Sequence, residues 1–246
     1  MPHYALLVCL GWLGATFVTA QAAQAQNEVE ITAEPHHHLA FSNEYLRVFN
    51  VHVDPNDETQ MHWHRHDYIA VNLGIAELSN TVKDKPPVSV KIPDGDVRFS
   101  SANFAHSVRA VNQPFRNVTI EILQDESLRN SVAAGKIHWD EDRGLEVLDH
   151  GTKQILFVKD GIRVTEFELQ PGGTVPMQHH AGPHLLVAVT DLDLRTDVTS
   201  DDPHGPQGPM RGRFTSGDSK WLPGNYSHTI TNLGTKPAKF VTLEFP

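Results

Sequence analysis

The amino-acid sequence predicts an all-β fold made of two tandem barrels. Three observations support this: short strand-like runs throughout the chain, a repeat that relates its two halves, and histidines at matched places in both copies. The runs IAVNL, LLVAV, NVTIEI and FVTLEF are rich in Val, Ile, Thr and Phe, and Pro, Gly, Asn and Asp separate such runs. Strands and turns in this rhythm are typical of sandwiches and barrels.

Two stretches of the first half recur in the second half. YLRVFNVHVDPNDETQM (45–61) aligns with GIRVTEFELQPGGTVPM (161–177), and DGDVRFSSANFAHSV (94–108) aligns with SGDSKWLPGNYSHTI (216–230). Each half also closes with a similar strand, NVTIEIL in the first and FVTLEF in the second. Two copies of one fold explain these matches.

The start of the chain has the pattern of an export signal. Residues 5–20 carry no charge, and the small residues Ala23–Ala25 offer a cleavage site. Because the uncharged stretch is shorter than the roughly 18 residues of a membrane span, we predict a cleaved signal peptide, rather than a membrane anchor or a misassigned start. The mature protein is then secreted or periplasmic. The segments expected are a signal peptide at 1–25, a first domain at 26–123, a connector at 124–148 and a second domain at 149–246.

Composition excludes several classes of function. The chain has 246 residues and a net charge of −10 without a basic stripe, so we expect no nucleic-acid partner and no membrane partner after signal cleavage. Cys9 is the only cysteine and leaves with the signal peptide, which excludes thiolate metal sites and cysteine nucleophiles. The sequence also lacks a serine-nucleophile elbow, a phosphate loop and a dinucleotide fingerprint.

The 16 histidines are the unusual feature of the composition, and their placement is informative. His62 and His64 stand two residues apart in MHWHRHD, so on a strand both point to one face. Asp67 follows near the next turn, and His106 lies on another strand. A metal needs three or four ligands from more than one element, and two strands of a small barrel can supply them. The histidines assigned instead to solvated loops are His66 and His36–His38.

The second copy repeats this placement. His180 stands at the position of His64, His228 at that of His106, and His184 near that of Asp67, whereas Gln178 replaces His62. Random histidines would not recur at matched places in both halves.

With these motifs, the chain resembles the two-domain members of the cupin family. The family motifs are G-x5-H-x-H-x3/4-E-x6-G and G-x5-P-x-G-x2-H-x3-N. The second copy contains Gly217-x5-Pro223-x-Asn225-x2-His228-x3-Asn232, and the first contains Gly95-x5-Ser101-x-Asn103-x2-His106. Asn replaces Gly in both copies, which a turn with positive φ tolerates. Asp67-x6-Gly74 has the spacing of E-x6-G, but Asp67 follows His64 one residue too early.

The resemblance implies two double-stranded β-helix (jelly-roll) barrels that bind metal. In the first barrel it implies a divalent transition metal, Fe, Mn, Ni, Cu or Zn, on His62, His64, Asp67 and His106. In the second barrel His180, His184 and His228 form a second candidate site near Gln178. Asp67, if loosely ligated, is also expected to act as a general base close to the substrate.

The expected function is that of a metal-dependent, dioxygenase-like oxidoreductase acting on a small oxygenated organic molecule. The quercetinase-like bicupins are the nearest analogy, on the level of fold alone. Two alternatives stay open: a metal-dependent isomerase or lyase acting on a sugar-derived or keto acid, and a bicupin that binds a small molecule without turnover. The oligomeric state considered for the chain is a homodimer.

Overall fold

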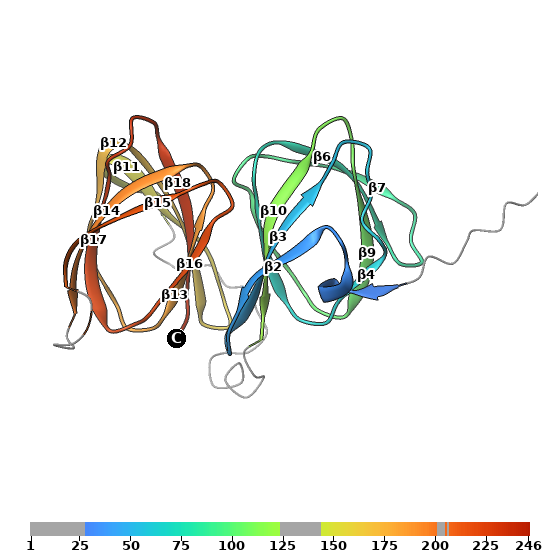
Figure 1. Cartoon of the computed structure of the whole chain (residues 1–246), viewed down its shortest axis with the longest axis horizontal. Helices are drawn as coiled ribbons and strands as arrows, with labels where there is room; N and C mark the ends of the chain where they lie inside the picture. The colour runs from blue at the N-terminus through green and yellow to red at the C-terminus, as the bar shows by residue number, and fades with distance from the viewer. Residues whose placement is uncertain (1–27, 124–143, 201–204, 206) are drawn as a thin grey trace, which may run out of the picture.

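The structure, a computed structural model, describes residues 28–123, 144–200, 205 and 207–246. Figure 1 shows two β-barrels side by side, the first in blue and green and the second in yellow to red. The expected signal peptide lies outside the described residues, as does most of the expected connector. Strand β11 begins at Glu146, within the C-terminal end of that expected connector.

The first barrel consists of two five-stranded sheets. One sheet has the strand order β1-β4-β9-β6-β7 and the other β2-β3-β10-β5-β8. A short 3-10 helix, Ile31–Ala33, follows the first strand. The strands are β1 (Val29–Glu30), β2 (His37–Ser42), β3 (Leu46–Val53), β4 (His62–His64), β5 (Tyr68–Asn72), β6 (Ala76–Val82), β7 (Val88–Ile92), β8 (Val97–Ser100), β9 (Phe104–Ala110) and β10 (Phe115–Ile122).

The second barrel repeats this plan with one change. Its strand β12 corresponds to β3 and β4 joined into one strand. The first part of β12 pairs with β18, as β3 pairs with β10, and the second part pairs with β17, as β4 pairs with β9. The sheet order is β15-β14-β17-β12-β18-β13-β16, with β11 on β12. The strands are β11 (Glu146–Lys159), β12 (Ile162–His180), β13 (His184–Ala188), β14 (Leu192–Ser200), β15 (Gly208–Phe214), β16 (Ser219–Leu222), β17 (Tyr226–Asn232) and β18 (Ala238–Glu244).

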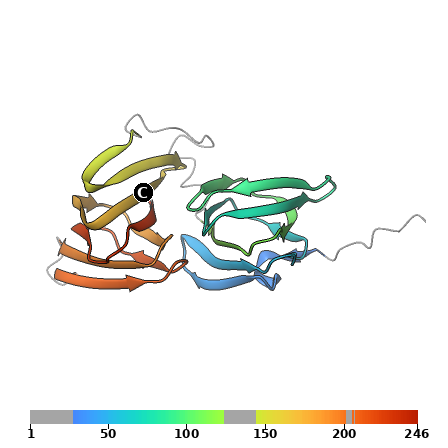
Figure 2. The ribbon, with the colours of Figure 1, turned by 90° about the horizontal axis from the view of Figure 1, so that it is seen from above.

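The largest buried cluster lies between the barrels rather than inside either one. It combines the side chains of β3, β5 and β10, such as Val48, Ile69 and Ile120, with those of β12, β13 and β18, such as Val164 and Leu243. Figure 2 shows the two barrels next to each other. Because side chains alternate along a strand, each of these strands gives one face to the shared core and the other face to its own barrel.

The expectation that Asn can replace Gly in the turn of the second motif, where φ is positive, is confirmed by the backbone. Asn103 has φ of 65° and Asn225 has φ of 60°. Each of these residues donates its N–H to the carbonyl of a histidine, Asn103 to His64 and Asn225 to His180, both at 2.7 Å. The turn is therefore hydrogen-bonded to the end of the strand that carries His64 or His180, and it leads directly into the strand that carries His106 or His228.

The described residues contain strands, turns and one 3-10 helix but no α-helix. Among them no helix is long and apolar enough to cross a membrane. The all-β prediction is thus confirmed for this part of the chain.

Candidate metal centre

Three of the predicted ligands of the first barrel converge, because two neighbouring strands carry them. His62 and His64 both point inward from β4, and His62 lies opposite His106 of β9 in the strand ladder. The rings of His62 and His106 have centroids 4.7 Å apart, and those of His64 and His106 5.0 Å. Trp63, between the two histidines, points outward and packs beneath the guanidinium of Arg65, as strand alternation requires.

The outer nitrogens of His62 and His106 are held by oxygen acceptors. Nδ1 of His62 lies 2.8 Å from the carbonyl oxygen of Gln60, and Nδ1 of His106 lies 2.9 Å from Oδ1 of Asn80. A ring that donates Nδ1–H to an oxygen keeps a lone pair on Nε2, which is the tautomer that binds metal. Nε2 of His62 is buried and has no hydrogen-bond partner among the described residues. The site therefore presents a buried nitrogen whose lone pair is available to a metal ion.

The spacing of the inner nitrogens also fits a metal. Nε2 of His64 lies 3.1 Å from Nε2 of His106. Two nitrogens on neighbouring positions around one ion, each about 2.1 Å from it, stand roughly 3.0–3.4 Å apart.

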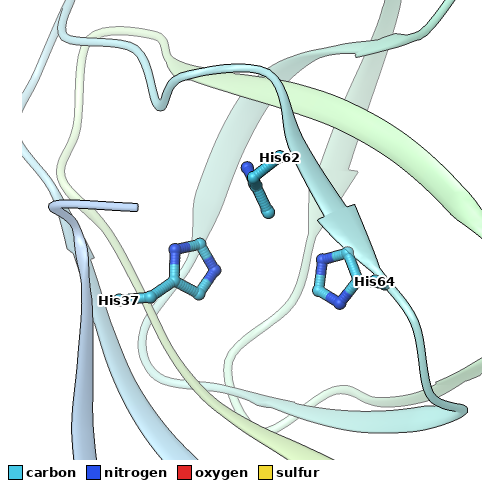
Figure 3. A group of neighbouring side chains, drawn as sticks. All are labelled: His37, His62 and His64. Atoms are coloured by element: carbon cyan, nitrogen blue, oxygen red, sulfur yellow. The ribbon is translucent and has the colours of Figure 1, made fainter. Parts of the chain in front are cut away.

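His37 of β2 completes the cluster, and the sequence did not predict it. Figure 3 shows His37 facing His62 and His64, and one ring nitrogen from each of the three lies within 4.8 Å of the others. The assignment of His37 to a solvated loop is wrong, because its side chain is only 5% exposed. The sequence signal was weak: EPHHH lies ahead of the repeated segment, and only pairing with β3 turns His37 inward.

Glu34 holds His37 in place. Its fully buried carboxylate lies 2.6 Å from Nδ1 of His37 and 2.9 Å from Nδ1 of His36, and it accepts the backbone N–H of Gln60. Burial alone would raise the pKa of Glu34, but the hydrogen bonds from His37 and His36 outweigh it and hold the pKa at about 2. The ionised carboxylate thus directs Nε2 of His37 toward the other ligands.

Asp67 is not part of this cluster, which corrects the expectation that it is a ligand and a general base. Its carboxylate accepts the backbone N–H of Ala102 at 2.8 Å, and it lines a small space between the barrels beside Lys159 and Ile162. The physical reason is strand alternation. Tyr68 and Ala70 face the barrel interior, so Asp67 and Ile69 face outward.

The buried histidines are poised to bind a cation. Burial, together with the neighbouring histidines, lowers the pKa of His62 to about 4 and that of His106 to about 3. Burial also lowers the pKa of His64. All three rings are therefore neutral at pH 7, the state in which imidazole binds metal.

The cluster opens into a cavity of about 310 Å³. Its described lining contains no Asp or Glu. Beside the histidines it offers Asn80, Asn117 and Thr119, and the guanidinium-bearing side chain of Arg98. Arg98 also pairs with Asp96 at the surface. Tyr68 and Phe104 lie against His64, with ring centroids 4.2 and 5.4 Å away.

The second barrel keeps part of this arrangement. Nε2 of His180 lies 3.1 Å from Nε2 of His228, the same spacing as in the first barrel. Gln178 lies opposite His228, where the first barrel has His62 opposite His106. The third histidine, His184, has its Nε2 3.1 Å from the hydroxyl of Tyr226. Burial lowers the pKa of His184 to about 3 and that of His228 to about 4, so both are neutral at pH 7.

Strand register refines the position of His184. His184 lies opposite Leu222 and Glu244, as Tyr68 lies opposite Ser100 and Glu121. His184 is therefore the counterpart of Tyr68 and not of Asp67. The cavity around it measures about 100 Å³ and is lined mainly by apolar side chains, among them Phe167, Leu194 and Phe214.

No protein-family model matches this chain, and no curated protein matches it. Solved structures of oxalate decarboxylases do. One, from Lactobacillus farciminis in complex with formate, has a TM-score of 0.58 and 17% identity over 83% of this chain and 78% of that chain. Another, from Bacillus subtilis and studied for its Mn(II) centres, has a TM-score of 0.58 and 15% identity over 82% of this chain and 69% of that chain. At such identities the likeness establishes the fold.

Proposed function

We propose that this chain, which has the fold of a bicupin, is a metal-dependent enzyme that oxidises a small organic acid in the cavity of the first barrel. The fold neighbours that act on oxalate, including one that holds formate, support the substrate class. The converging histidines support the metal.

The observation that carries the proposal is the charge of the cavity. His37, His62, His64 and His106 would hold the ion through neutral nitrogens, and no carboxylate stands among the described lining residues. The ligands themselves then leave the positive charge of a divalent ion uncompensated, and the carboxylates of Glu34, on His37, and Asp96, on Arg98, stand behind the lining rather than in it. Such a cavity favours an anionic substrate, and a guanidinium can bind a carboxylate through two parallel hydrogen bonds.

The polar side chains of one sheet orient the substrate. Arg98, Ala70 and Thr119 lie side by side on neighbouring strands, and all three line the cavity. Ala70 stands between Arg98 and Thr119 and leaves room above the sheet, while the hydroxyl of Thr119 donates to Oδ1 of Asn117 and keeps its lone pairs for the substrate. When bound, the metal would polarise the substrate and, if redox-active, allow its reaction with oxygen.

Oxidation is favoured over isomerisation or a lyase reaction because the described lining of the cavity contains no carboxylate that could act as a base. Asp67, expected in that role, lies outside the cavity. Burial raises the pKa of Tyr68, so its hydroxyl stays protonated near neutral pH. Proton abstraction from carbon needs a positioned base, whereas chemistry with oxygen draws on the metal.

The donor set also bears on the metal. Imidazole suits Fe, Ni, Cu and Zn, whereas Mn prefers carboxylate and water oxygens. We therefore propose iron, nickel or copper as the working metal. Secretion through the signal peptide at residues 1–25, a second metal on His180, His184 and His228, and a homodimer remain part of the proposal.

The experiment combines metal analysis with a substrate screen. Protein purified without a tag is analysed for metal content and then incubated with small mono-, di- and 2-keto acids, and with flavonols and diketones. Oxygen uptake and carbon dioxide release are recorded together. We expect bound metal and oxygen uptake that depends on one of the acids, and neither in His62→Ala.

Other outcomes replace the proposal with defined alternatives. Carbon dioxide release without oxygen uptake assigns a non-oxidative decarboxylase. Tight binding of an acid without turnover assigns a binding protein. Protein without metal that takes up none on titration overturns the proposal.

A further inference from the structure

Glu121 of β10 is a buried carboxylate next to the candidate metal centre. It follows Thr119 by two residues and so shares the inward face of the strand. Its side chain is fully buried, and Oε2 lies 2.8 Å from a terminal nitrogen of Arg47. Beyond this ion pair, neither carboxylate oxygen has a hydrogen-bond partner among the described residues. A buried acceptor without a donor destabilises the fold, and a charged one more so, which points to a donor close to this carboxylate.

His64 has the matching deficit. Its Nε2 faces His106, but its Nδ1 is buried and also lacks a partner within the described part of the chain. In the other two β4 and β9 histidines the corresponding nitrogen is held by an oxygen, Gln60 for His62 and Asn80 for His106. Of these three ligands, His64 is therefore the one whose Nδ1 has no hydrogen bond to fix the orientation of its ring.

The second barrel shows the contact that the first one lacks. Glu244 of β18 lies 3.2 Å from Nδ1 of His180. Glu244 lies opposite Arg163 and His184 in the ladder, as Glu121 lies opposite Arg47 and Tyr68. Glu121 and Glu244 thus hold the same place in the two copies.

The two histidines also adopt matching poses. His180 stacks on His184 at 4.3 Å, and His64 stacks on Tyr68 at 4.2 Å. Both rings keep an Nε2 to Nε2 distance of 3.1 Å to their histidine partners. With one face and the Nε2 atom of each ring placed alike, Nδ1 points toward the same place in each barrel.

We propose that Glu121 is the positioning residue of His64: it accepts a hydrogen bond from Nδ1–H of that ligand in the metal-loaded first barrel, with Arg47 holding the carboxylate in reach. This inference rests on the metal-binding function proposed above. A carboxylate in this role fixes the ring and makes Nε2 a stronger donor, and loss of such a partner typically costs about 10–100-fold in metal affinity.

The test measures zinc binding and the state of His64 separately. Zn(II) affinity is measured by competition with a chromophoric chelator, and the first-barrel site is identified as the one that His62→Ala removes. Glu121→Gln should weaken this site by about 10–100-fold. The matched control, Glu244→Gln, removes the corresponding carboxylate of the second barrel and should leave the first site unchanged.

The state of His64 is read by NMR of ¹⁵N-histidine protein loaded with zinc. The Nδ1–H signal of His64, assigned by its loss in His64→Gln, should lie downfield in the unaltered protein and in Glu244→Gln, and move upfield in Glu121→Gln. If Glu121→Gln does not fold, Glu121→Asp is used, because it keeps the charge opposite Arg47 and shortens the reach to His64. Folding is checked by the melting temperature without metal.

Each result has one meaning. Equal affinity in Glu121→Gln and the unaltered protein overturns the inference while leaving the proposed function intact. Weaker binding without a change in the Nδ1–H signal also overturns it, because the effect is then on the fold. If the unaltered protein binds no metal, the proposed function fails and the inference fails with it.

Discussion

The two barrels share a pair of histidines but differ in what surrounds the pair. The pair is His64 and His106 in the first barrel and His180 and His228 in the second, and in both the Nε2 atoms are 3.1 Å apart. The first barrel adds His62 and His37 around a larger cavity. The second barrel has Gln178 at the place of His62. It has Lys153 at the place of His37, because Lys153 pairs with Phe167 as His37 pairs with Val51.

This difference teaches that the fold supplies two ligands and that the further ligands are local additions. The Asn turns and the strand register hold the shared pair in both copies. The additional imidazoles come from positions where the copies diverge, and two exchanges, Gln178 for His62 and Lys153 for His37, separate the first cluster from the second. The following predictions test that contrast.

The largest effect is expected when the diverging position of β4 is altered. His62→Ala removes a buried ligand whose Nε2 has no hydrogen-bond partner among the described residues. The metal affinity of the first barrel should therefore fall by more than about 100-fold, which exceeds the loss expected when only a hydrogen-bond partner of a ligand is removed. Gln178→Ala, at the matched place, should leave total metal content unchanged. Metal per chain after dialysis measures both. Equal losses in the two variants would contradict the contrast between the barrels.

A smaller loss is expected at His37. His37→Ala leaves three imidazoles in place, so the first barrel should still bind metal, with affinity reduced by about 10–100-fold. His38→Ala, on the exposed side of the same strand, serves as the control and should bind normally. Chelator competition measures both. Unchanged affinity in His37→Ala would restrict the site to the histidines of β4 and β9.

Acid should destabilise the metal-free protein, and His62 should account for part of this. Burial lowers the pKa of His62 from 6.5 to about 4, so between these values the unfolded chain binds more protons. Stability is therefore present above about pH 6.5 and is lost as the pH falls toward 4, by up to about 3 kcal/mol for this group. His62→Gln, which copies the second barrel, should show a shallower fall in melting temperature between pH 7 and 4. Gln178→Ala should keep the original slope, and an unchanged slope in His62→Gln would contradict the assignment.

The smallest effect is expected at Asp67. Asp67→Asn keeps an oxygen that can accept the N–H of Ala102, so the free energy of unfolding should change by less than about 1 kcal/mol. Because Asp67 lies between the barrels, turnover and metal content should also stay close to those of the unaltered protein. Loss of turnover at full metal content would return Asp67 to the role of a base.

The repeat and the strand alternation were enough to predict part of the site. HWH on a strand must place His62 and His64 on one face, and the matched histidine of the second motif had to come from a neighbouring strand of the same barrel. The Asn turns were predictable because a positive φ is a local property. His37 was not, since nothing near it in the sequence states which strand it pairs with.

The sequence by itself therefore determined the all-β architecture, its duplication and the shared histidine pair, because short-range alternation and turn residues encode them. The tertiary structure alone decided that His37 joins the cluster, that Tyr68 rather than Asp67 faces the cavity, and that the largest core lies between the barrels. The reason is that a strand has two faces and a shift of one residue exchanges them. Which face becomes the inside is set by the sheets that pack against it, and those come from distant parts of the chain.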